Sequence, residues 1–362
     1  MDSALTRHIL VVNAGSSSLK LSLLDGNDVV VASRDLDTPR DAAEALGAFV
    51  SDAPADIAAV GHRVVHGGTD FTSAVVIDPA VERALSELTQ LAPLHQPAAL
   101  AAIHDARRAI PGVPHVACFD TAFHASLPPA AATYALPAEW RAQWPLRRFG
   151  FHGLSHAYAS RRACDLAGAP VEQARVVSCH LGGGASLCAV EGGRSVDTTM
   201  GFTPLQGLVM ATRAGSIDPG IVTWLQQRGG VTVDEVQEAL ERKSGLVGLC
   251  GTSDMREVIS RRSAGDADAT LAFDVYCHSL RRALGAMTAV LGGADIVVFT
   301  GGVGEHAAEV RATCGLALDP STNASASTDT EISAPGAASR TFVVTAREDL
   351  EIASQVRALL DA

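Results

Sequence analysis

Short apolar runs alternate with amphipathic segments along the whole chain. The first apolar run, at 8–12, ends in a serine-rich turn at 13–18 and resumes at 19–24 with apolar and polar residues in alternation. Apolar runs on both sides of a short polar turn predict a β-hairpin. The same succession returns at 175–190 with a glycine-rich turn, and at 295–305 an apolar strand leads into glycines and then into a helical pattern.

These three turns are candidate phosphate-binding loops, and their recurrence favours a duplicated fold. Glycine lets backbone amides approach an anion closely, and neighbouring hydroxyls add donors. A lone Gly/Ser turn is more often an ordinary hairpin, but two equivalent hairpins half a chain apart predict two related halves that face a common cleft. None of the turns has the spacing of a P-loop or of G-x-G-x-x-G after a strand, which argues against both of those nucleotide-binding folds.

The remaining periodic segments complete an α/β pattern. We expect helices at 41–51, 79–91, 98–110, 136–143, 221–227, 233–243, 266–291 and 350–360, and strands at 57–65, 113–119 and 341–345. The stretch at 197–220 has little periodicity and is punctuated by glycine, which is typical of a functional loop. We expect a polar turn at 244–256 and a mobile surface loop at 321–339, where small polar residues predominate.

Length and composition limit the class of protein. A chain of 362 residues exceeds one usual core and predicts about two domains. The apolar share of 47% with only 4% aromatic residues implies a core of Ala, Val and Leu. The net charge of −12, together with basic patches no denser than adjacent arginine pairs, argues against a nucleic-acid partner.

The sequence shows no pattern of export or membrane insertion. The first twenty residues lack a basic segment followed by a long apolar one, and no stretch of about 18 apolar residues occurs. The seven cysteines are odd in number and form no C-x-x-C. They fit reduced thiols better than a disulfide framework or a zinc site. We therefore expect a soluble cytoplasmic protein with no membrane partner.

Four segments carry candidate chemistry of their own. Arg63 stands where a strand opens into Gly67-Gly68, and it either points into a cleft or lies on the surface. Asp120 follows a strand end, where carboxylates commonly bind metal or substrate, with helix capping as the structural alternative. His95 lies between two prolines, and an isolated histidine of this kind is more often a buried structural residue. The segment 147–156 is dense in aromatic, glycine and histidine residues, so we expect it to form an active-site wall.

Nine blocks spread over nearly the whole chain carry a family resemblance. In order they read VVNAGSSSLK, GHRVVHGG, LAPLH, FDTAFH, RFGFHGLSH, HLGGGAS, DTTMGFTPLQGL, TRAGSIDPG and FTGGVGEH. With them the chain resembles the acetokinase family of the acetate and sugar kinase, Hsc70 and actin superfamily. The resemblance implies two duplicated actin-like (ribonuclease H-like) α/β domains with a cleft between them. It also implies direct in-line transfer of the ATP γ-phosphoryl group to acetate, giving acetyl phosphate and ADP reversibly, with Mg²⁺ and with Mn²⁺ as an alternative ion.

The resemblance assigns roles to individual residues. Two arginines would hold the acetate carboxylate and the phosphoryl group in flight, an aspartate would be the catalytic carboxylate, and a histidine would stabilise the transition state. These catalytic residues are Arg63, Arg213, Asp120 and His152. Mg²⁺ would be held by Asn13 and Glu348. Acetate would contact Arg63, Val65, Leu94, His95, Phe151 and Pro204. The nucleotide would contact Lys20, Ser16, Ser18, His180, Leu181, Gly182, Gly183, Gly184, Asp254, Met255, Arg256, Gly301, Gly302, Val303, Gly304 and Glu305.

Elementary chemistry agrees with these roles. Acetate is ionised at neutral pH and needs no general base, so Asp120 is better cast as a metal or positioning group. The acceptor and the γ-phosphate are both anions and repel each other. Two arginines, a histidine and Mg²⁺ would offset that repulsion, and each arginine can engage two oxygens at once.

Four single positions depart from the usual family pattern, and so does the segment Thr345-Ala346-Arg347-Glu348-Asp349, where the family usually has TNEE before the last helix. Gly183 stands where the family usually has Asn, Gln206 and Ser216 where it has Glu and Asp, and His306 where it has Asn. These changes leave open a propionate or butyrate kinase, decided by the size of the acyl pocket, and a pyrophosphate-linked acetate kinase. A non-catalytic nucleotide-binding regulator on the same fold is the alternative from a different class.

The resemblance also predicts the organisation of the chain. The first domain would comprise 1–121 and 350–362, and the second, 122–349, would carry most of the nucleotide site. Closure of the two domains would exclude water and so limit ATP hydrolysis. A homodimer through the second domain is expected, and the helix at 266–291 is a candidate contact.

Overall fold

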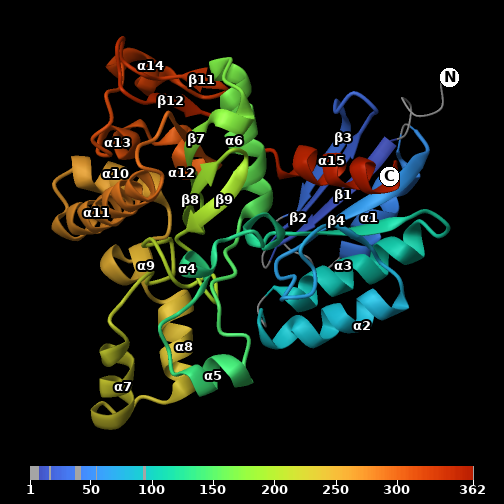
Figure 1. Cartoon of the computed structure of the whole chain (residues 1–362), viewed down its shortest axis with the longest axis horizontal. Coiled ribbons are helices and arrows are strands. Elements are labelled where there is room, and N and C mark those ends of the chain that lie inside the picture. Colours follow the sequence, from blue (N-terminus) through green and yellow to red (C-terminus); the bar gives the residue numbers. More distant parts are fainter. Residues whose placement is uncertain (1–7, 16–17, 37–41, 54, 93–94, 362) are drawn as a thin grey trace. The chain divides into compact units, whose positions relative to one another are not determined.

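The computed structural model describes residues 8–15, 18–36, 42–53, 55–92 and 95–361. The chain forms two compact units: unit 1 comprises Met1–Ala125, Phe151–Tyr158 and Arg347–Ala362, and unit 2 comprises Ser126–Gly150 and Ala159–Ala346 (Figure 1). The domain limits expected from the sequence remain a prediction. The two units differ from them chiefly at 151–158, which belongs to unit 1 although the sequence assigns it to the second domain. Within the described ranges, no helix is both long and apolar enough to cross a membrane.

Unit 1 is built on a six-stranded sheet in the order β3-β2-β1-β4-β6-β5. The strands are β1 (His8–Ala14), β2 (Leu19–Leu24), β3 (Val30–Leu36), β4 (Ile57–Val64), β5 (Val75–Val76) and β6 (His115–Phe119). The first three pair antiparallel, which confirms the predicted hairpin, and β4 and β6 continue the sheet parallel to β1. Because parallel strands end at the same edge, Asn13, Arg63 and Asp120 come to one edge of this sheet.

Both faces of the unit 1 sheet are covered by helices. These helices are α1 (Ala42–Ser51), α2 (Pro79–Glu87), α3 (Gln96–Ala109) and α15 (Glu348–Leu360). Leu10 and Val12 of β1 pack on one face with α1 and α3. Ile9 and Val11 point to the other face and pack with α15 (Figure 1). A strand buried on both faces explains why this run is apolar at every position.

Unit 2 repeats the sheet of unit 1. Its strands are β7 (Arg175–Leu181), β8 (Ala185–Glu191), β9 (Arg194–Thr198), β10 (Ile296–Thr300), β11 (Thr330–Glu331) and β12 (Arg340–Val343), in the order β11-β12-β10-β7-β8-β9. An antiparallel run β7-β8-β9 is again extended by two parallel strands and closed by a short antiparallel edge strand. The duplicated fold expected from the recurring turns is therefore present.

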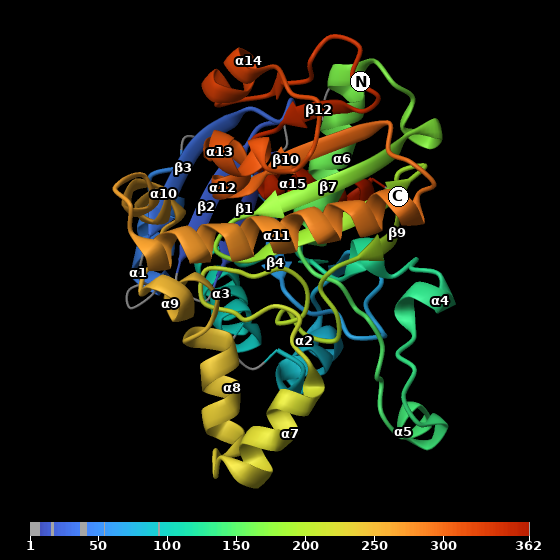
Figure 2. The same ribbon diagram turned by 90° about the vertical axis from the view of Figure 1, so that its left-hand side faces the viewer.

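The helices described in unit 2 mostly have ten residues or fewer. They are α4 (Pro129–Ala132), α5 (Ala138–Gln143), α7 (Pro219–Arg228), α8 (Val233–Arg242), α9 (Gly245–Cys250), α10 (Met255–Ser263), α11 (Ala267–Val290), α12 (Gly301–His306), α13 (Ala308–Ala312) and α14 (Pro320–Ser325), while α6 (Gly153–Ala167) begins in unit 1. The long helix α11 runs along the sheet of its own unit (Figure 2) and buries Phe273, Tyr276 and Leu280. One face of the predicted subunit-contact helix is thus already occupied.

Three predictions about local structure were wrong or incomplete. The stretch 244–256 is not only a polar turn, since α9 and the start of α10 lie in it. The predicted loop at 321–339 contains most of α14 and the strand β11, and it buries Asn323 and Ile332. Helix α6 was not predicted, because its hydrophobic residues are interrupted by Ser, Arg and Asp at irregular spacing. In each segment, tertiary packing decided the structure against a weak local pattern.

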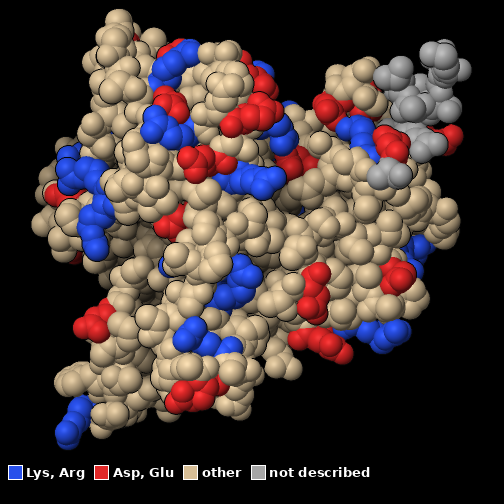
Figure 3. All heavy atoms as spheres, viewed as in Figure 1, with Lys and Arg blue, Asp and Glu red and all other residues tan. Residues whose placement is uncertain are grey.

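Charged side chains are interspersed over the face seen in Figure 3. Lysine and arginine alternate there with aspartate and glutamate rather than gathering into one large basic area. This distribution agrees with the net charge of −12.

Candidate active site

A buried arginine–carboxylate pair lies at the carboxyl edge of the unit 1 sheet. Nε of Arg63 donates to both carboxylate oxygens of Asp120 at 3.2 Å, and a terminal nitrogen donates to Oδ2 at 2.6 Å. Arg63 also donates to Oδ1 of Asn13 at 3.3 Å, and Asn13 donates to Oε2 of Glu348 at 2.8 Å. The structure thus brings together four residues that the sequence predicts for the site, supplied by β1, by the end regions of β4 and β6, and by the first turn of α15.

A tight turn holds Asp120 from a second direction. The backbone N–H of His152 donates to the Asp120 carboxylate, and that of Gly153 donates to the Asp120 backbone oxygen at 2.9 Å. His152 has φ 57°, in the left-handed region that residues other than glycine rarely adopt. A Cβ on Gly153 would lie 2.1 Å from the Asp120 oxygen, so only glycine fits there. The turn fixes the backbone of His152 next to Asp120.

Burial and charge act in opposite directions on this pair. Burial disfavours the charge of Arg63, but Asp120 and Glu348 hold the pKa of its guanidinium above the ordinary value. Burial also raises the pKa of Asp120, and the contact with Arg63 opposes that rise. The two-pronged geometry is that of an ion pair, so Asp120 acts as a carboxylate that orients Arg63.

Two of the apolar residues predicted to contact acetate lie in the interior of unit 1. Val65 and Phe151 are both buried, at 3% and 1% exposure. The buried ring of His66, which the sequence did not single out, meets Phe151 edge-on with 5.5 Å between centroids. His95 stands at the start of α3 and is partly buried. Leu94, also predicted for this pocket, lies outside the described residues.

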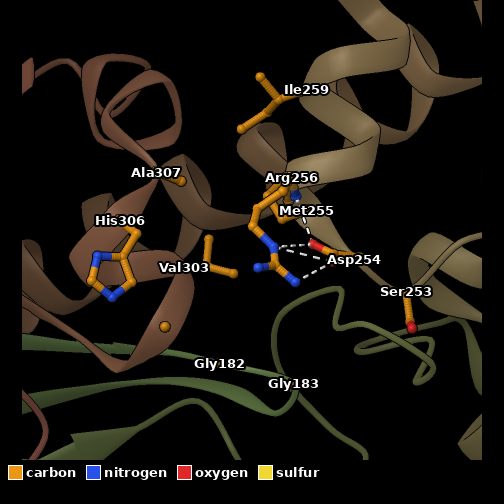
Figure 4. Close-up of a pocket in the computed structure, with 11 residues that line it drawn as sticks. Gly182, Gly183, Ser253, Asp254, Met255, Arg256, Ile259, Val303, His306 and Ala307 are labelled. Atoms are coloured by element: carbon orange, nitrogen blue, oxygen red, sulfur yellow. Dashed lines mark hydrogen bonds and ion pairs between the residues drawn. The ribbon is translucent and has the colours of Figure 1, made fainter.

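Unit 2 contains an open cavity of about 530 Å³ (Figure 4). It is lined by Gly182, Gly183, Ser253, Asp254, Met255, Arg256, Ile259, Gly302, Val303, His306 and Ala307. The turn after β7 supplies the first two, α10 and the residues before it form one wall, and α12 with Ala307 forms another (Figure 4). Seven of these eleven residues are predicted nucleotide contacts.

The first turn of α10 presents an ion pair at the cavity. Asp254 caps the helix by accepting from the Arg256 backbone N–H at 2.9 Å, and it also pairs with the Arg256 side chain at 2.6 Å. Hydrogen bonds from Arg256 lower the pKa of Asp254. The Arg256 side chain is 89% exposed, so it remains accessible to a ligand.

Four lining residues were not predicted for this cavity: Ser253, Ile259, His306 and Ala307. Ile259 lies four residues after Met255 on α10, so helical spacing identifies it only once α10 is recognised as a helix. His306 is noticeable in the sequence only as a departure from the family pattern. The predicted contacts of unit 2 that do not line the cavity are His180, Leu181, Gly184, Gly301, Gly304 and Glu305, which belong to the same segments.

The glycine-rich segment after β10 is held by its own glutamate. Oε1 of Glu305 accepts from the backbone N–H of Gly301 and from that of Ala346, both at 3.0 Å. Gly301 has φ 78°, and a Cβ there would lie 2.8 Å from the Leu181 backbone oxygen. Glu305 therefore holds the segment that forms this wall of the cavity, and Gly301 allows β10 and β7 to end close together.

Arg213 is a partly buried cation of unit 2. It donates to the backbone oxygen of Pro204 at 3.4 Å and approaches Sδ of Met210 at 3.9 Å. Among the described residues, no carboxylate lies within 4 Å of it, and burial lowers the pKa of Arg213, opposed by Glu241. A guanidinium without a neighbouring carboxylate is suited to bind an anion.

The first serine-rich turn belongs to unit 1, whereas all lining residues of the cavity belong to unit 2. Lys20 of β2 is largely exposed and lies 3.9 Å from Asp35. The backbone oxygen of Ser18 accepts from Gly15 at 2.8 Å and closes the turn. Ser16 lies outside the described residues.

Asn13 and Glu348 together offer the oxygen ligands that Mg²⁺ prefers. The described part of the chain gathers no group of three or more His, Cys, Asp or Glu side chains for a metal. In kinases, however, Mg²⁺ is commonly held by one or two carboxylates, with substrate phosphates and water as the other ligands. Asn13 and Glu348, joined at 2.8 Å, fit an ion of this kind.

A duplicated ribonuclease H-like fold, with anion-binding chemistry at the ends of its strands, is the arrangement of the actin-like phosphotransferases. Within that class, the model of the acetokinase family matches residues 40–354, and the chain belongs to this family. The match spans both units and includes every predicted catalytic residue. Of the predicted site residues, those outside the match are Asn13, Ser16, Ser18 and Lys20.

Individual relatives agree with this assignment. An acetate kinase of Leifsonia xyli subsp. xyli is 45% identical over 386 residues, covering 96% of this chain and 97% of its own. An acetate kinase of Synechococcus sp. is 49% identical over 314 residues, covering 84% and 77%. Among solved structures, Porphyromonas gingivalis acetate kinase matches with TM-score 0.90 at 34% identity, covering 98% and 100%. A propionate kinase of Francisella tularensis matches with TM-score 0.89 at 34% identity, covering 96% and 98%.

Proposed function

We propose that the protein is a kinase that transfers the γ-phosphoryl group of ATP to acetate and gives acetyl phosphate and ADP, reversibly. Family membership supports the reaction, and the curated acetate kinases at 39–49% identity support acetate as the acceptor. The observation that carries the proposal is the buried pair of Arg63 and Asp120 beside Asn13 and Glu348. It presents an oriented cation and oxygen ligands at one edge of a sheet.

The proposed step is a direct in-line displacement. An acetate oxygen attacks the γ-phosphorus, the bond from phosphorus to the bridging oxygen breaks, and ADP leaves with the electron pair. Acetate is already ionised, so no base has to remove a proton. Arg63 would orient the acetate carboxylate, and Arg213 and His152 would stabilise charge on the phosphoryl oxygens. Asp120 would keep the guanidinium of Arg63 oriented.

Asn13 and Glu348 are the proposed residues that hold Mg²⁺, with Mn²⁺ as an alternative ion. When bound, the ion would offset charge on the β- and γ-phosphates. Asn13 carries no charge, so the pair would contribute a single negative charge to the ion. That leaves positive charge available for the phosphates of the nucleotide.

The cavity of unit 2 supports ATP over pyrophosphate as the phosphoryl donor. Pyrophosphate needs a small and strongly basic site. The cavity instead has room for a nucleoside, at about 530 Å³, and Met255, Ile259 and Val303 give it apolar walls that suit a base. Gly183 borders open space, so the missing side chain at this position removes a contact without closing the cavity.

A propionate or butyrate kinase is the nearest alternative. The propionate kinase of Francisella tularensis is as similar in fold as the acetate kinases, so fold similarity alone does not rank the acids. Bulky walls at Val65 and Phe151 support the smallest acid. A non-catalytic regulator is disfavoured, because it would have no use for Arg63 held by Asp120.

We further propose that the protein is a cytoplasmic homodimer that associates through unit 2. All seven cysteines are buried free thiols, which fits a reducing compartment. On unit 2, Ile221 and Trp224 of α7 are 48% and 61% exposed, and Ile217, just before this helix, is 37% exposed, so the three form an apolar stripe. An exposed apolar stripe of this kind is typical of an association surface.

The test is a hydroxamate assay of the purified protein with acetate, MgATP and hydroxylamine. Parallel reactions contain propionate, butyrate or formate as acceptor, and pyrophosphate as donor. We expect acetyl hydroxamate with ATP, and more of it than with the longer acids. A higher rate with propionate than with acetate would change the assigned acceptor. A higher rate with pyrophosphate than with ATP would change the assigned donor. No product with any pair, despite measurable ATP binding, would leave a regulator as the function.

A further inference from the structure

Arg311 is the largest fully buried side chain among the described residues, at 1% exposure. It belongs to α13, the short helix that follows the glycine-rich segment of the cavity. Burial lowers the pKa of Arg311, opposed by the charge of Glu309, and no carboxylate of the described chain lies within 4 Å of it. A buried charge without a counter-ion is costly, so its hydrogen bonds have to compensate for the loss of water.

The Arg311 guanidinium donates four hydrogen bonds. The acceptors lie in two places, the end of α12 and Asn323. One terminal nitrogen donates to the backbone oxygens of Gly304 and Glu305 at 2.8 and 2.9 Å. Nε donates to Oδ1 of Asn323 at 2.7 Å, and the other terminal nitrogen donates to the Asn323 backbone oxygen at 2.6 Å. Arg311 thus joins the last turn of α12 to α14.

The last turn of α12 is part of the cavity wall. Gly302, Val303 and His306 of this helix line the cavity, and Gly304 and Glu305 lie between Val303 and His306 in the sequence. Figure 4 shows Val303 and His306 at the cavity. A positive charge at the C-terminal carbonyls of a helix is also electrostatically favourable. Since Glu305 holds the beginning of α12 and Arg311 holds its end, the helix is fixed at both ends relative to the sheet.

Asn323 connects this contact to a segment that the sequence presents as a plain polar loop. Asn323 is 5% exposed and donates through Nδ2 to the backbone oxygen of Ala308 at 3.1 Å. It therefore bridges Arg311 and the first residue of α13. The loop at 321–339 is anchored behind the cavity instead of being free at the surface.

We propose that Arg311 is a positioning residue for the nucleotide site, acting through α12 and braced by Asn323 of α14. The inference rests on the proposed function, since it takes the unit 2 cavity as the site of the nucleotide. Arg311 does not touch the nucleotide. It sets the position of Val303 and His306, and so the affinity for ATP and ADP, without affecting acetate.

Arg311→Lys is the informative variant. Lysine keeps the charge, but its three donors radiate from a single nitrogen and cannot span both α12 and Asn323. We expect ADP to bind about tenfold more weakly to Arg311→Lys, by analogy with the loss of groups that orient a binding site from behind. The KM for ATP should rise by a similar factor, while the KM for acetate stays within roughly twofold. Isothermal titration with ADP and two-substrate kinetics give the three values.

Two further variants separate positioning from general stability. Arg340→Lys is the matched control, because Arg340 also lies in unit 2 but pairs with Glu331 at the surface; it should leave ADP affinity unchanged. Asn323→Ala retains the hydrogen bonds from Arg311 to α12, so it should also weaken ADP binding, but by a smaller factor than Arg311→Lys. This variant still tests the proposal if Arg311→Lys does not fold.

The outcomes distinguish the inference from the proposed function. Unchanged ADP affinity in both Arg311→Lys and Asn323→Ala, even with a lower melting temperature, would overturn the positioning role and leave Arg311 purely structural. Equal losses in Arg340→Lys would overturn it as well. If the wild-type protein binds ADP but forms no acetyl phosphate, the proposed function fails, whereas the effect of Arg311→Lys on ADP binding still supports the inference.

Discussion

Arg63 and Arg213 are both shielded from water, but their surroundings differ. Arg63 is fixed by Asp120, Asn13 and Glu348, whereas Arg213 has only backbone and sulfur contacts within reach. A charge already paired inside the protein contributes to stability as well as to catalysis. A charge that is not paired is available for a ligand. We therefore expect Arg63 to contribute to both stability and turnover, and Arg213 to contribute to turnover alone.

Removing either arginine should lower turnover, but only one removal should destabilise the fold. We expect Arg63→Ala and Arg213→Ala each to reduce kcat by roughly 10²- to 10³-fold, as for loss of a group that stabilises a transition-state oxyanion. Arg63→Ala also leaves the Asp120 carboxylate buried alone, which costs about 3 kcal/mol. Steady-state kinetics and thermal melting give both values.

Arg63→Lys is the control for this experiment. It keeps a charge for Asp120 but loses the two-pronged contact, so most of the stability should return while turnover stays low. If both alanine variants turn over at near wild-type rates, neither arginine belongs to the mechanism.

Parallel strands β4 and β6 carry a buried histidine pair, and His62 of this pair directly precedes the predicted catalytic residue Arg63. Nε2 of His62 lies 3.0 Å from Nδ1 of His115, whose Nε2 lies 3.2 Å from the Ile110 backbone oxygen. A carbonyl only accepts, so His115 donates to Ile110 and accepts from His62. Nδ1 of His62 is then unprotonated, buried, and without a partner among the described residues. Both rings are neutral, and neither has room for a second proton.

This pair should make the protein acid-sensitive. Burial is the main cause that lowers the pKa of His62 from 6.5 to about 3, and the positive charge of Arg107 adds to it. Between those values the unfolded chain takes up a proton that the folded chain does not, so stability falls as pH falls. The loss is about 1.4 kcal/mol per pH unit for one such group.

Urea unfolding at pH 7, 6 and 5 checks this slope. His62→Phe removes the group and should flatten the dependence, even if its stability at pH 7 differs from that of the wild type. A slope that is equally steep in His62→Phe would assign the acid sensitivity to other groups.

As a whole molecule, the chain has two α/β units with the same sheet order, and unit 2 exposes an apolar stripe at the start of α7. The stripe of Ile217, Ile221 and Trp224 belongs to unit 2, as do the other two tryptophans, Trp140 and Trp144, which are about half exposed. Water contact with large apolar side chains is unfavourable, and a symmetric dimer is the commonest way in which such a surface is covered.

The expected oligomer is a dimer of the 37.4 kDa chain. Trp224→Glu should shift it toward the monomer, because the carboxylate would have to be buried at the contact. Trp140→Glu on α5 introduces the same change at another exposed tryptophan of unit 2 and should leave the dimer intact. Light scattering after size-exclusion chromatography distinguishes the masses. A wild-type monomer at micromolar concentration, or a Trp224→Glu dimer, would contradict this assignment.

The sequence by itself determined the elements whose signal is local. The apolar run ending in Asn13, the repeated hairpin ending near His180 and the strand before Gly301 predict the duplicated sheets, because a period of two and a glycine turn depend only on neighbouring residues. The nine motif blocks were sufficient for the family. Residues such as Arg63 and Asp120 could be named as candidates, because each stands at a strand end.

Only the tertiary structure decided which of these residues act together. The pairing of Arg63 with Asp120, and of Asn13 with Glu348 at a separation of 335 residues, arises where distant strands and α15 meet. Likewise α14 has a weak local pattern, and its structure depends on Arg311 finding Asn323 from another helix. Burial, left-handed backbone at His152 and long-range hydrogen bonds are properties of packed elements, so no local window of sequence contains them.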